Sequence, residues 1–271
     1  MKYVAFLDIL GFKDKLRRIS QNEVANYFRS FSSTAFFQWE KERVSKLSGY
    51  IVSDSFVINS NNASSDSLQE LVQVVINICK QEFAENSILI RGAIAKGDYD
   101  RLDARKITSL RKGLIVGQAY VDAYTLEETV KVTGIVLSQD VYEYLLNIGR
   151  YAENVFLESI QKKNHYILRY LTLDFLLEKD NLTAFTKLAI ESKCLPHYYN
   201  TLYLALKREK NEKLVNQLFQ TLIEILNDDS PSENWRAVDL FIKNSFNNEV
   251  ISEYQTRFLK YIRQSIISYN C

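Results

Sequence analysis

The sequence predicts an α+β fold: a ferredoxin-like βαββαβ domain followed by helices. Through residue 96, short β-branched and aromatic stretches alternate with longer stretches in which apolar residues recur at helical spacing. Their order is strand, helix, two strands, helix, strand. From about residue 175 onward only amphipathic helical patterns occur. We therefore expect a domain over 1–174 and an all-helical C-terminal domain or extension over 175–271.

Each expected element has its own signal. Residues 3–9 form an apolar run typical of a buried strand, and apolar residues recur at helical spacing over 13–45. Residues 49–59 contain two apolar halves around Ser53-Asp54-Ser55, which indicates a hairpin. The remaining expected elements are a helix over 67–84 capped by Ser65 or Ser67, a strand over 88–96, a charged loop, a strand over 113–117, a helix over 118–131, a strand over 133–138, a helix over 138–147 and closing strands over 155–160 and 165–171.

Composition excludes several classes of function. Lys and Arg number 34 against 33 Asp and Glu, so no basic excess points to nucleic acid or to an anionic membrane. Three scattered cysteines and two histidines favour neither a disulfide framework nor a zinc site. No apolar run reaches the roughly 18 residues that span a bilayer, and the N-terminal run reads as a strand rather than a signal peptide. We expect a cytoplasmic protein.

Two acidic residues stand out because each lies in an apolar strand context. In a βαββαβ sheet the strand order 4-1-3-2 places the end of the first strand beside the hairpin tip and the start of the fourth strand. Asp8, Asp54 and Arg91 should therefore meet. A divalent cation between the two carboxylates would relieve their repulsion, and Mg²⁺ and Mn²⁺ both accept such ligands. The alternative is that Asp8 caps a helix and Asp54 only serves the turn.

Five segments over about residues 3–170 resemble, in order, motifs of the class III nucleotide cyclases. The sequence F-L-D-I-L-G-F resembles the first metal-binding strand, F-x-D-I-x-G-F, and V-S-D-S-F resembles the second metal-binding hairpin. I-R-G-A-I-A-K-G resembles the strand R-x-G-I-x-x-G, and the segment over 117–127 resembles the helix G-x-x-V-N-x-A-x-R-L-E. The closing motif, I-V-x-S-x-x-V, matches residues 135–141.

The resemblance implies a nucleoside triphosphate substrate and two divalent cations, Mn²⁺ or Mg²⁺. Asp8, Asp54 and the carbonyl of Ile9 would ligate the cations. It also implies a head-to-tail homodimer with sites at the interface, with no nucleic acid and no membrane as partner. The remaining substrate contacts would come from Phe6, near the sugar or base, and from the backbone amides of Leu10, Gly11 and Phe12, around the terminal phosphates.

Departures from the family pattern narrow the prediction. Val121 and Thr125 replace the helix Asn and Arg, and Tyr50 and Leu114 replace the purine-reading pair. With these changes the chain looks like the pyrimidine nucleotide cyclases of bacterial Pycsar anti-phage systems, which implies cyclisation of UTP or CTP to a second messenger. Arg91 would then take over the triphosphate contact of the missing helix Arg, since its planar fork matches phosphate oxygens.

Other interpretations remain open. The chain can be a catalytically degenerate cyclase fold that binds nucleotide or a partner protein, or an adenylate cyclase. Arg91 can be a strand-edge ion pair, and Tyr50 a half-buried strand aromatic. The sequence does not choose between uracil and cytosine.

Overall fold

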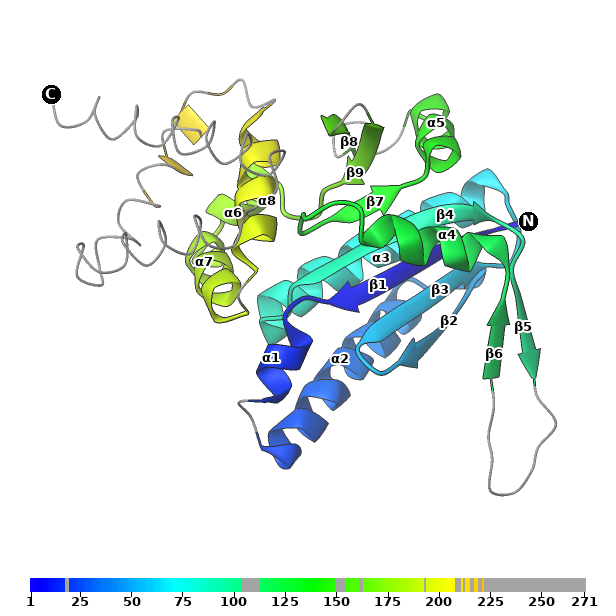
Figure 1. Ribbon diagram of the computed structural model, residues 1–271, viewed down its shortest axis with the longest axis horizontal. Coiled ribbons are helices and arrows are strands. Elements are labelled where there is room, and N and C mark those ends of the chain that lie inside the picture. The colour runs from blue at the N-terminus through cyan, green and yellow to red at the C-terminus, as the bar shows by residue number, and fades with distance from the viewer. Residues whose placement is uncertain are drawn as a thin grey trace, which may run out of the picture. The chain divides into compact units, whose positions relative to one another are not determined.

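The computed structural model describes residues 1–17, 20–103, 113–149, 155–160, 163–192 and 194–207, with a few positions between 211 and 221 (Figure 1). The chain divides into two compact units. The first comprises Met1–Val130, Gly134–Ser159 and Lys163–Tyr170; the second comprises Lys131–Thr133, Ile160–Lys162 and Leu171–Cys271.

A mixed sheet forms the centre of the first unit. In the described part of the chain it has seven strands in the order β2-β3-β1-β4-β7-β9-β8. The predicted order 4-1-3-2 is confirmed, because β1 pairs antiparallel with both β3 and β4, and β2 pairs with β3. β7 joins β4 in parallel. The strands are β1 Lys2–Ile9, β2 Leu47–Val52, β3 Ser55–Ser60, β4 Ile90–Gly97, β7 Ile135–Leu137, β8 Val155–Ile160 and β9 Lys163–Leu168.

Helices cover the two faces of this sheet differently. The long helices α2 (Gln21–Lys41) and α3 (Ser65–Asn86) lie on one face, and α4 (Gln118–Glu127) lies on the other, over β1 and β4 (Figure 1). Phe56, which pairs with Leu7, contacts Phe31 of α2 with ring centroids 4.6 Å apart. Phe6 instead contacts Tyr124 of α4 at 5.2 Å. Because side chains alternate along a strand, Asp8 lies on the α4 face with Phe6.

The expected helix over 13–45 is two helices. The short α1, Phe12–Leu16, follows β1, and α2 begins after Ser20. Ser20 Oγ accepts a hydrogen bond from the Glu23 amide, and the Glu23 carboxylate accepts one from the Ser20 amide. This reciprocal capping box starts a new helix at Gln21. The boundary between α1 and α2 was not visible in the sequence, because apolar residues recur at helical spacing on both sides of it.

The segment after β4 also differs from the prediction. It begins with strand β5, Asp100–Asp103, which pairs antiparallel with β6, Gly113–Val116, in a separate two-stranded sheet. Residues 104–112 of the predicted charged loop lie outside the described residues. Helix α4 ends at Glu127 rather than 131, and α5 spans Gln139–Asn147.

The start of β4 is fixed by Tyr170, just beyond the last strand. Its fully buried hydroxyl donates to the Ile90 carbonyl at 2.8 Å and accepts from the Ile90 amide at 3.1 Å. Two residues along, a side chain at Gly92 would overlap the Phe6 carbonyl oxygen, so only glycine permits this approach of β4 to β1. Arg91 is held between these two fixed positions.

The second unit contains helices in the part after Leu171 that the structure describes. Its helices are α6 Leu173–Leu177, α7 Asn181–Glu191 and α8 Leu195–Lys207. The Thr186 and Tyr198 hydroxyls lie 2.9 Å apart and join α7 to α8. The helical prediction is confirmed over these residues and stays a prediction for most of 208–271, which lie outside the description. Among the residues searched, none of the helices is long and apolar enough to cross a membrane.

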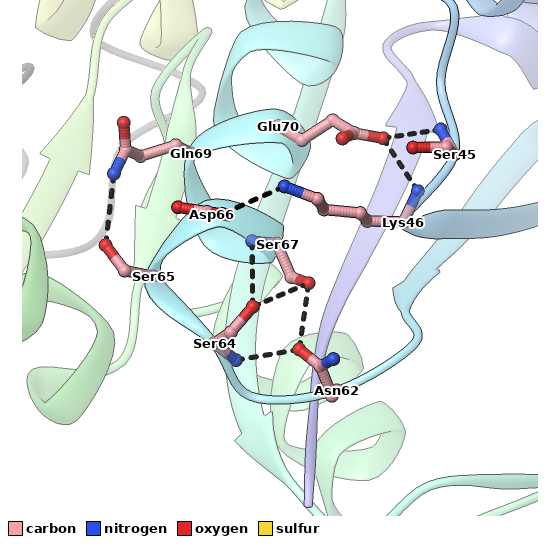
Figure 2. Close-up of polar contacts among 9 residues, drawn as sticks. All are labelled: Ser45, Lys46, Asn62, Ser64, Ser65, Asp66, Ser67, Gln69 and Glu70. Carbon is pink, nitrogen blue, oxygen red and sulfur yellow. Dashed lines mark hydrogen bonds and ion pairs between the residues drawn. The ribbon is translucent and has the colours of Figure 1, made fainter.

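Helix α3 is capped by Ser64, not by Ser65 or Ser67 as predicted. Ser64 has extended backbone angles, and its Oγ accepts from the Ser67 amide at 3.2 Å (Figure 2). The Ser67 hydroxyl is turned back to the Asn62 side chain at 2.9 Å. Glu70, one turn further on, accepts the amides that lead into β2, those of Ser45 and Lys46, both at 2.9 Å.

Replacing the cap should weaken the fold measurably. Ser64→Ala removes the acceptor of an otherwise unpaired helix amide, and we expect a loss of about 1 kcal/mol in the free energy of unfolding, measured in urea. Ser65→Ala is the matched control, since its hydroxyl contacts only the Gln69 side chain among the bonds seen. Equal stability of the two variants would show that Ser64 is not the cap.

A carboxyl group is buried between α2 and α3. Glu82 is fully buried, and its Oε2 accepts from Asn86 at 2.9 Å. Glu82 Oε1 is also buried and has no hydrogen-bond partner among the described residues. Burial raises the pKa of this carboxyl from its ordinary 4.5 to about 7, against the lowering effect of hydrogen bonds from Asn86 and Thr34. The folded protein therefore favours the protonated form.

Stability should consequently fall with rising pH. The unfolded chain releases this proton near pH 4.5 and the folded chain near pH 7, so the contribution is fully present below pH 4.5 and is lost by pH 7, up to about 3 kcal/mol. We expect Glu82→Gln to unfold in urea with a smaller decline between pH 5 and 8 than the native chain. The exposed Glu40→Gln serves as control, because Glu40 is not among the groups that shift the pKa of Glu82. A decline that is the same in Glu82→Gln would contradict the assignment.

Candidate functional site

Two of the three residues that were predicted to meet, Asp8 and Arg91, stand side by side in one rung across the sheet. Asp8 stands opposite Ser55 of β3 on one side and opposite Arg91 of β4 on the other. The Ser55 hydroxyl donates to Asp8 Oδ1 at 3.2 Å, and Arg91 Nη2 donates to Asp8 Oδ2 at 3.3 Å. Both charged side chains are about one-fifth exposed, so this carboxylate is supported by the sheet and still reachable.

Asp54 joins the same end of the sheet through the hairpin turn. Ser53 takes up a left-handed conformation with φ of 57°, and the Ile9 amide donates to the Asp54 carbonyl at 3.2 Å. In a strand the amide and carbonyl of one residue point to the same side. The Ile9 carbonyl is therefore expected to face the hairpin tip as well.

The electrostatics of Asp8 are set by opposing neighbours. Burial raises the pKa of its carboxyl, and the Asp54 charge raises it further. Arg91 and the Ser55 hydrogen bond lower it, with a net effect upward. A charged group that is partly buried beside a like charge favours an additional cation.

The residue types at this end of the sheet are compatible with a divalent cation. They offer two carboxylates and one backbone carbonyl, all oxygen donors of the kind that Mg²⁺ and Mn²⁺ prefer. In the described part of the chain there is no group of three or more His, Cys, Asp or Glu side chains that could enclose a metal. A site of this kind leaves several coordination positions for phosphate oxygens and water.

The predicted phosphate cradle consists of the amides of Leu10, Gly11 and Phe12, at the turn between β1 and α1. The Leu10 amide donates to the Leu89 carbonyl at 2.8 Å, so the ladder between β1 and the segment before β4 already uses it. Leu10 is therefore already paired in this structure, and its contact with phosphate stays a prediction. Gly11 follows with φ of 73° and turns the chain into α1, and Phe12 is buried. The amides of Gly11 and Phe12 remain the candidates.

The predicted base-pocket residues share the α4 face with Asp8. Phe6 is 6% exposed and meets the rings of Tyr120 and Tyr124 edge-on. Tyr50 lies two strands away in the same rung, through Val57, and is half-buried. Its hydroxyl is 3.5 Å from that of Tyr99. Aromatic side chains thus continue across the sheet from Asp8, and we call this set the aromatic surface: Phe6, Tyr50, Tyr99, Tyr120 and Tyr124. The side chain of Leu114, the other predicted base-reading position, lies outside what the structure describes.

Helix α4 presents the two substituted positions to solvent. Val121 is 51% exposed, and Thr125 is exposed one turn further on. Neither side chain carries a charge that could meet a phosphate. Arg91 is the basic side chain that the structure places beside Asp8.

Sequence reasoning missed the role of Glu127. This last residue of α4 is only 3% exposed, and its Oε1 forms an ion pair with Arg91 Nε. The signal was present in the spacing: Ala119, Ala123 and Glu127 recur every fourth residue, and the two alanines are the buried face of α4. An acidic residue on such a face needs a buried cationic partner.

Comparison with solved structures finds nucleotide cyclase domains. The guanylyl cyclase domain of the RhoGC fusion protein from the aquatic fungus Blastocladiella emersonii is 15% identical, over 62% of this chain and 94% of its own, with a TM-score of 0.49. A bacterial light-regulated adenylyl cyclase is 11% identical, over 70% of this chain and 97% of its own, with a TM-score of 0.47. The adenylyl cyclase CyaB from P. aeruginosa is 14% identical, over 62% and 93%, with a TM-score of 0.43.

No protein-family model matches the sequence, and no curated protein matches it. The similarity found is one of structure, to guanylyl and adenylyl cyclase domains.

Proposed function

We propose that this chain is a metal-dependent nucleotide cyclase that converts UTP or CTP to the 3′,5′-cyclic monophosphate and pyrophosphate, as a second messenger in anti-phage defence. The observation that carries the proposal is the rung Ser55–Asp8–Arg91 with Asp54 at the adjoining hairpin tip. It puts two carboxylates and a guanidinium within one small, partly exposed region. That donor set suits a triphosphate bound through divalent cations.

Each residue has a distinct task in this proposal. Asp8, Asp54 and the Ile9 carbonyl hold two cations, Mn²⁺ or Mg²⁺. When bound, these ions would lower the pKa of the ribose 3′-hydroxyl and neutralise the departing pyrophosphate. The Nη groups of Arg91 donate to phosphate oxygens as negative charge builds on them. The Gly11 and Phe12 amides orient the terminal phosphates.

The base specificity is proposed from the aromatic surface. Tyr50 occupies the position from which purine cyclases read their base, and its hydroxyl is already near Tyr99. A tyrosine here fills space that a purine ring needs, which suits the smaller uracil or cytosine ring. Phe6 lies on β1, the strand of Asp8 and two strands from Tyr50, and would pack near the sugar or base.

The deciding experiment is a comparison of the four ribonucleoside triphosphates. The purified chain is incubated with each of them and Mn²⁺, and the products are identified by mass spectrometry. We expect cyclic UMP or cyclic CMP far in excess of cyclic AMP and cyclic GMP. Equal or better cyclisation of ATP would reject the pyrimidine assignment and favour an adenylate cyclase.

A second candidate is a nucleotide- or protein-binding module that does not turn over. It is favoured by the two ion pairs that already engage Arg91 and by the uncharged Val121 and Thr125 on α4. This candidate predicts that a triphosphate raises the melting temperature without yielding cyclic product. Formation of cyclic nucleotide that depends on Asp54 excludes it.

The proposed enzyme works as a head-to-tail homodimer. Helix α4 exposes two apolar side chains, Val121 and Tyr124, each about half exposed. Such a surface suits burial against a second copy. The oligomeric state of the chain is measured by sedimentation with and without triphosphate, and the proposal expects a dimer.

A further inference from the structure

A buried carboxylate lies behind the arginine of the candidate site. The Glu127 side chain is 2% exposed and the Arg91 side chain 19%, and Glu127 Oε1 pairs with Arg91 Nε. An ionised carboxylate in such a position is costly unless it is paired. The ion pair therefore links the last turn of α4 to Arg91, the second residue of β4.

Arg91 uses different nitrogens for its two acidic partners. Nε faces Glu127, and Nη2 faces Asp8 Oδ2 at 3.3 Å. The guanidinium is a rigid plane, so fixing Nε at one end determines where the Nη edge points at the other. That edge lies at the Asp8 end of the rung.

We propose that Glu127 is a positioning residue, which holds Arg91 by Nε so that the Nη edge faces the cation and triphosphate end of the site. The proposal rests on the function proposed above. In this proposal Glu127 touches neither substrate nor cation and acts on them through its ion pair with Arg91.

Charge balance gives Glu127 a second effect through the same contact. Arg91 contacts the Asp8 carboxylate. In the proposed function a divalent cation would bind this same carboxylate. Glu127 neutralises the guanidinium from behind and so reduces its hold on Asp8. Without that negative charge, Arg91 competes more strongly for Asp8 and the cation binds less tightly.

The matched pair of variants is Glu127→Gln and Glu128→Gln. They remove the same charge from neighbouring positions, but Glu128 is exposed and caps the end of α4 through its backbone. Mn²⁺ affinity is measured without nucleotide, from the electron paramagnetic resonance of free Mn²⁺. We expect Glu127→Gln to weaken binding about ten-fold, the lower end of the usual loss for residues behind a metal ligand, and Glu128→Gln to leave it within two-fold. Equal affinities for the two variants overturn the proposal.

A measurement on the native chain guards against a variant that fails to fold. The Nε–H of Arg91, identified by its loss in Arg91→Lys, should give a side-chain resonance that exchanges slowly with water, because it is buried against Glu127. Rapid exchange of this proton overturns the proposal without any variant at Glu127. In Glu127→Asp, whose carboxylate is retracted, we expect faster exchange and partial recovery of Mn²⁺ affinity over Glu127→Gln.

These readouts separate the two proposals. If the chain forms no cyclic nucleotide but Glu127→Gln weakens Mn²⁺ binding and the Arg91 proton is protected, the positioning role stands and the cyclase assignment falls. If cyclic nucleotide forms and the two glutamine variants match the native chain in Mn²⁺ affinity, the positioning role falls alone.

Discussion

Asp54→Ala should abolish cyclic nucleotide formation, with a loss on the order of 10³-fold or more, while the chain keeps its fold. The substitution removes a side chain at the hairpin tip, but the hairpin is held to β1 by the hydrogen bond from the Ile9 amide to the Asp54 carbonyl. Alanine retains that carbonyl. Removal of a carboxylate from a site with only two should reduce the bound cations and the charge stabilisation they supply. Turnover is measured with UTP, CTP and Mn²⁺, and folding by circular dichroism.

Asp8→Ala should have the same effect on turnover but a different effect on stability. Asp8 is also the partner of Ser55 and Arg91, so alanine removes structural contacts along with the ligand. Asp98→Asn, an exposed acid at the far end of β4, is the control for a change of net charge. Near-native turnover of Asp54→Ala with Mn²⁺ would show that the cation site is misplaced.

Arg91→Ala should lower turnover by 10²–10³-fold, the usual loss when one preorganised charge donor is deleted. Val121 and Thr125 supply no charge in its place, and the pyrophosphate gains negative charge as its bond breaks. Arg91→Lys should recover only part of the rate, because a point charge does not make two parallel hydrogen bonds. Both variants are compared by kcat at a temperature well below the melting temperature of each.

The same substitution should also destabilise the fold. It breaks the buried ion pair between Arg91 and Glu127, and removing one partner of such a pair costs about 3–5 kcal/mol. The melting temperature therefore does not discriminate between the two roles of Arg91, whereas kcat per folded molecule does. A large loss of stability with an unchanged kcat would reject the catalytic role and leave Arg91 as an ion pair of the sheet.

The sheet order was predictable because it follows from patterns that are local in the sequence. Apolar runs give the strands, the turn around Asp54 gives the hairpin, and two long helices between them leave the 4-1-3-2 order as the natural connection. That order alone brings Asp8 to Arg91, 83 residues away.

What escaped prediction depends on single atoms rather than on periodicity. Whether Ser64 or Ser65 caps α3 is decided by which one adopts extended backbone angles. The contact of the Leu10 amide with the Leu89 carbonyl has no sequence signature, because Leu89 lies just before the first residue of β4. Glu127 was overlooked because its partner is recognised only once α4 is placed on the sheet.

The clamp of Tyr170 on Ile90 has a consequence for how this chain is made. The two residues are 80 positions apart, so on a ribosome β4 emerges long before the hydroxyl that pairs its first amide and carbonyl. Until residue 170 is synthesised, those two main-chain groups have only transient partners, and the start of β4 should become fixed late. A nascent chain stalled at about residue 160 should accordingly be digested by protease within β4, and one stalled far enough past residue 170 to release it from the ribosome should be protected there.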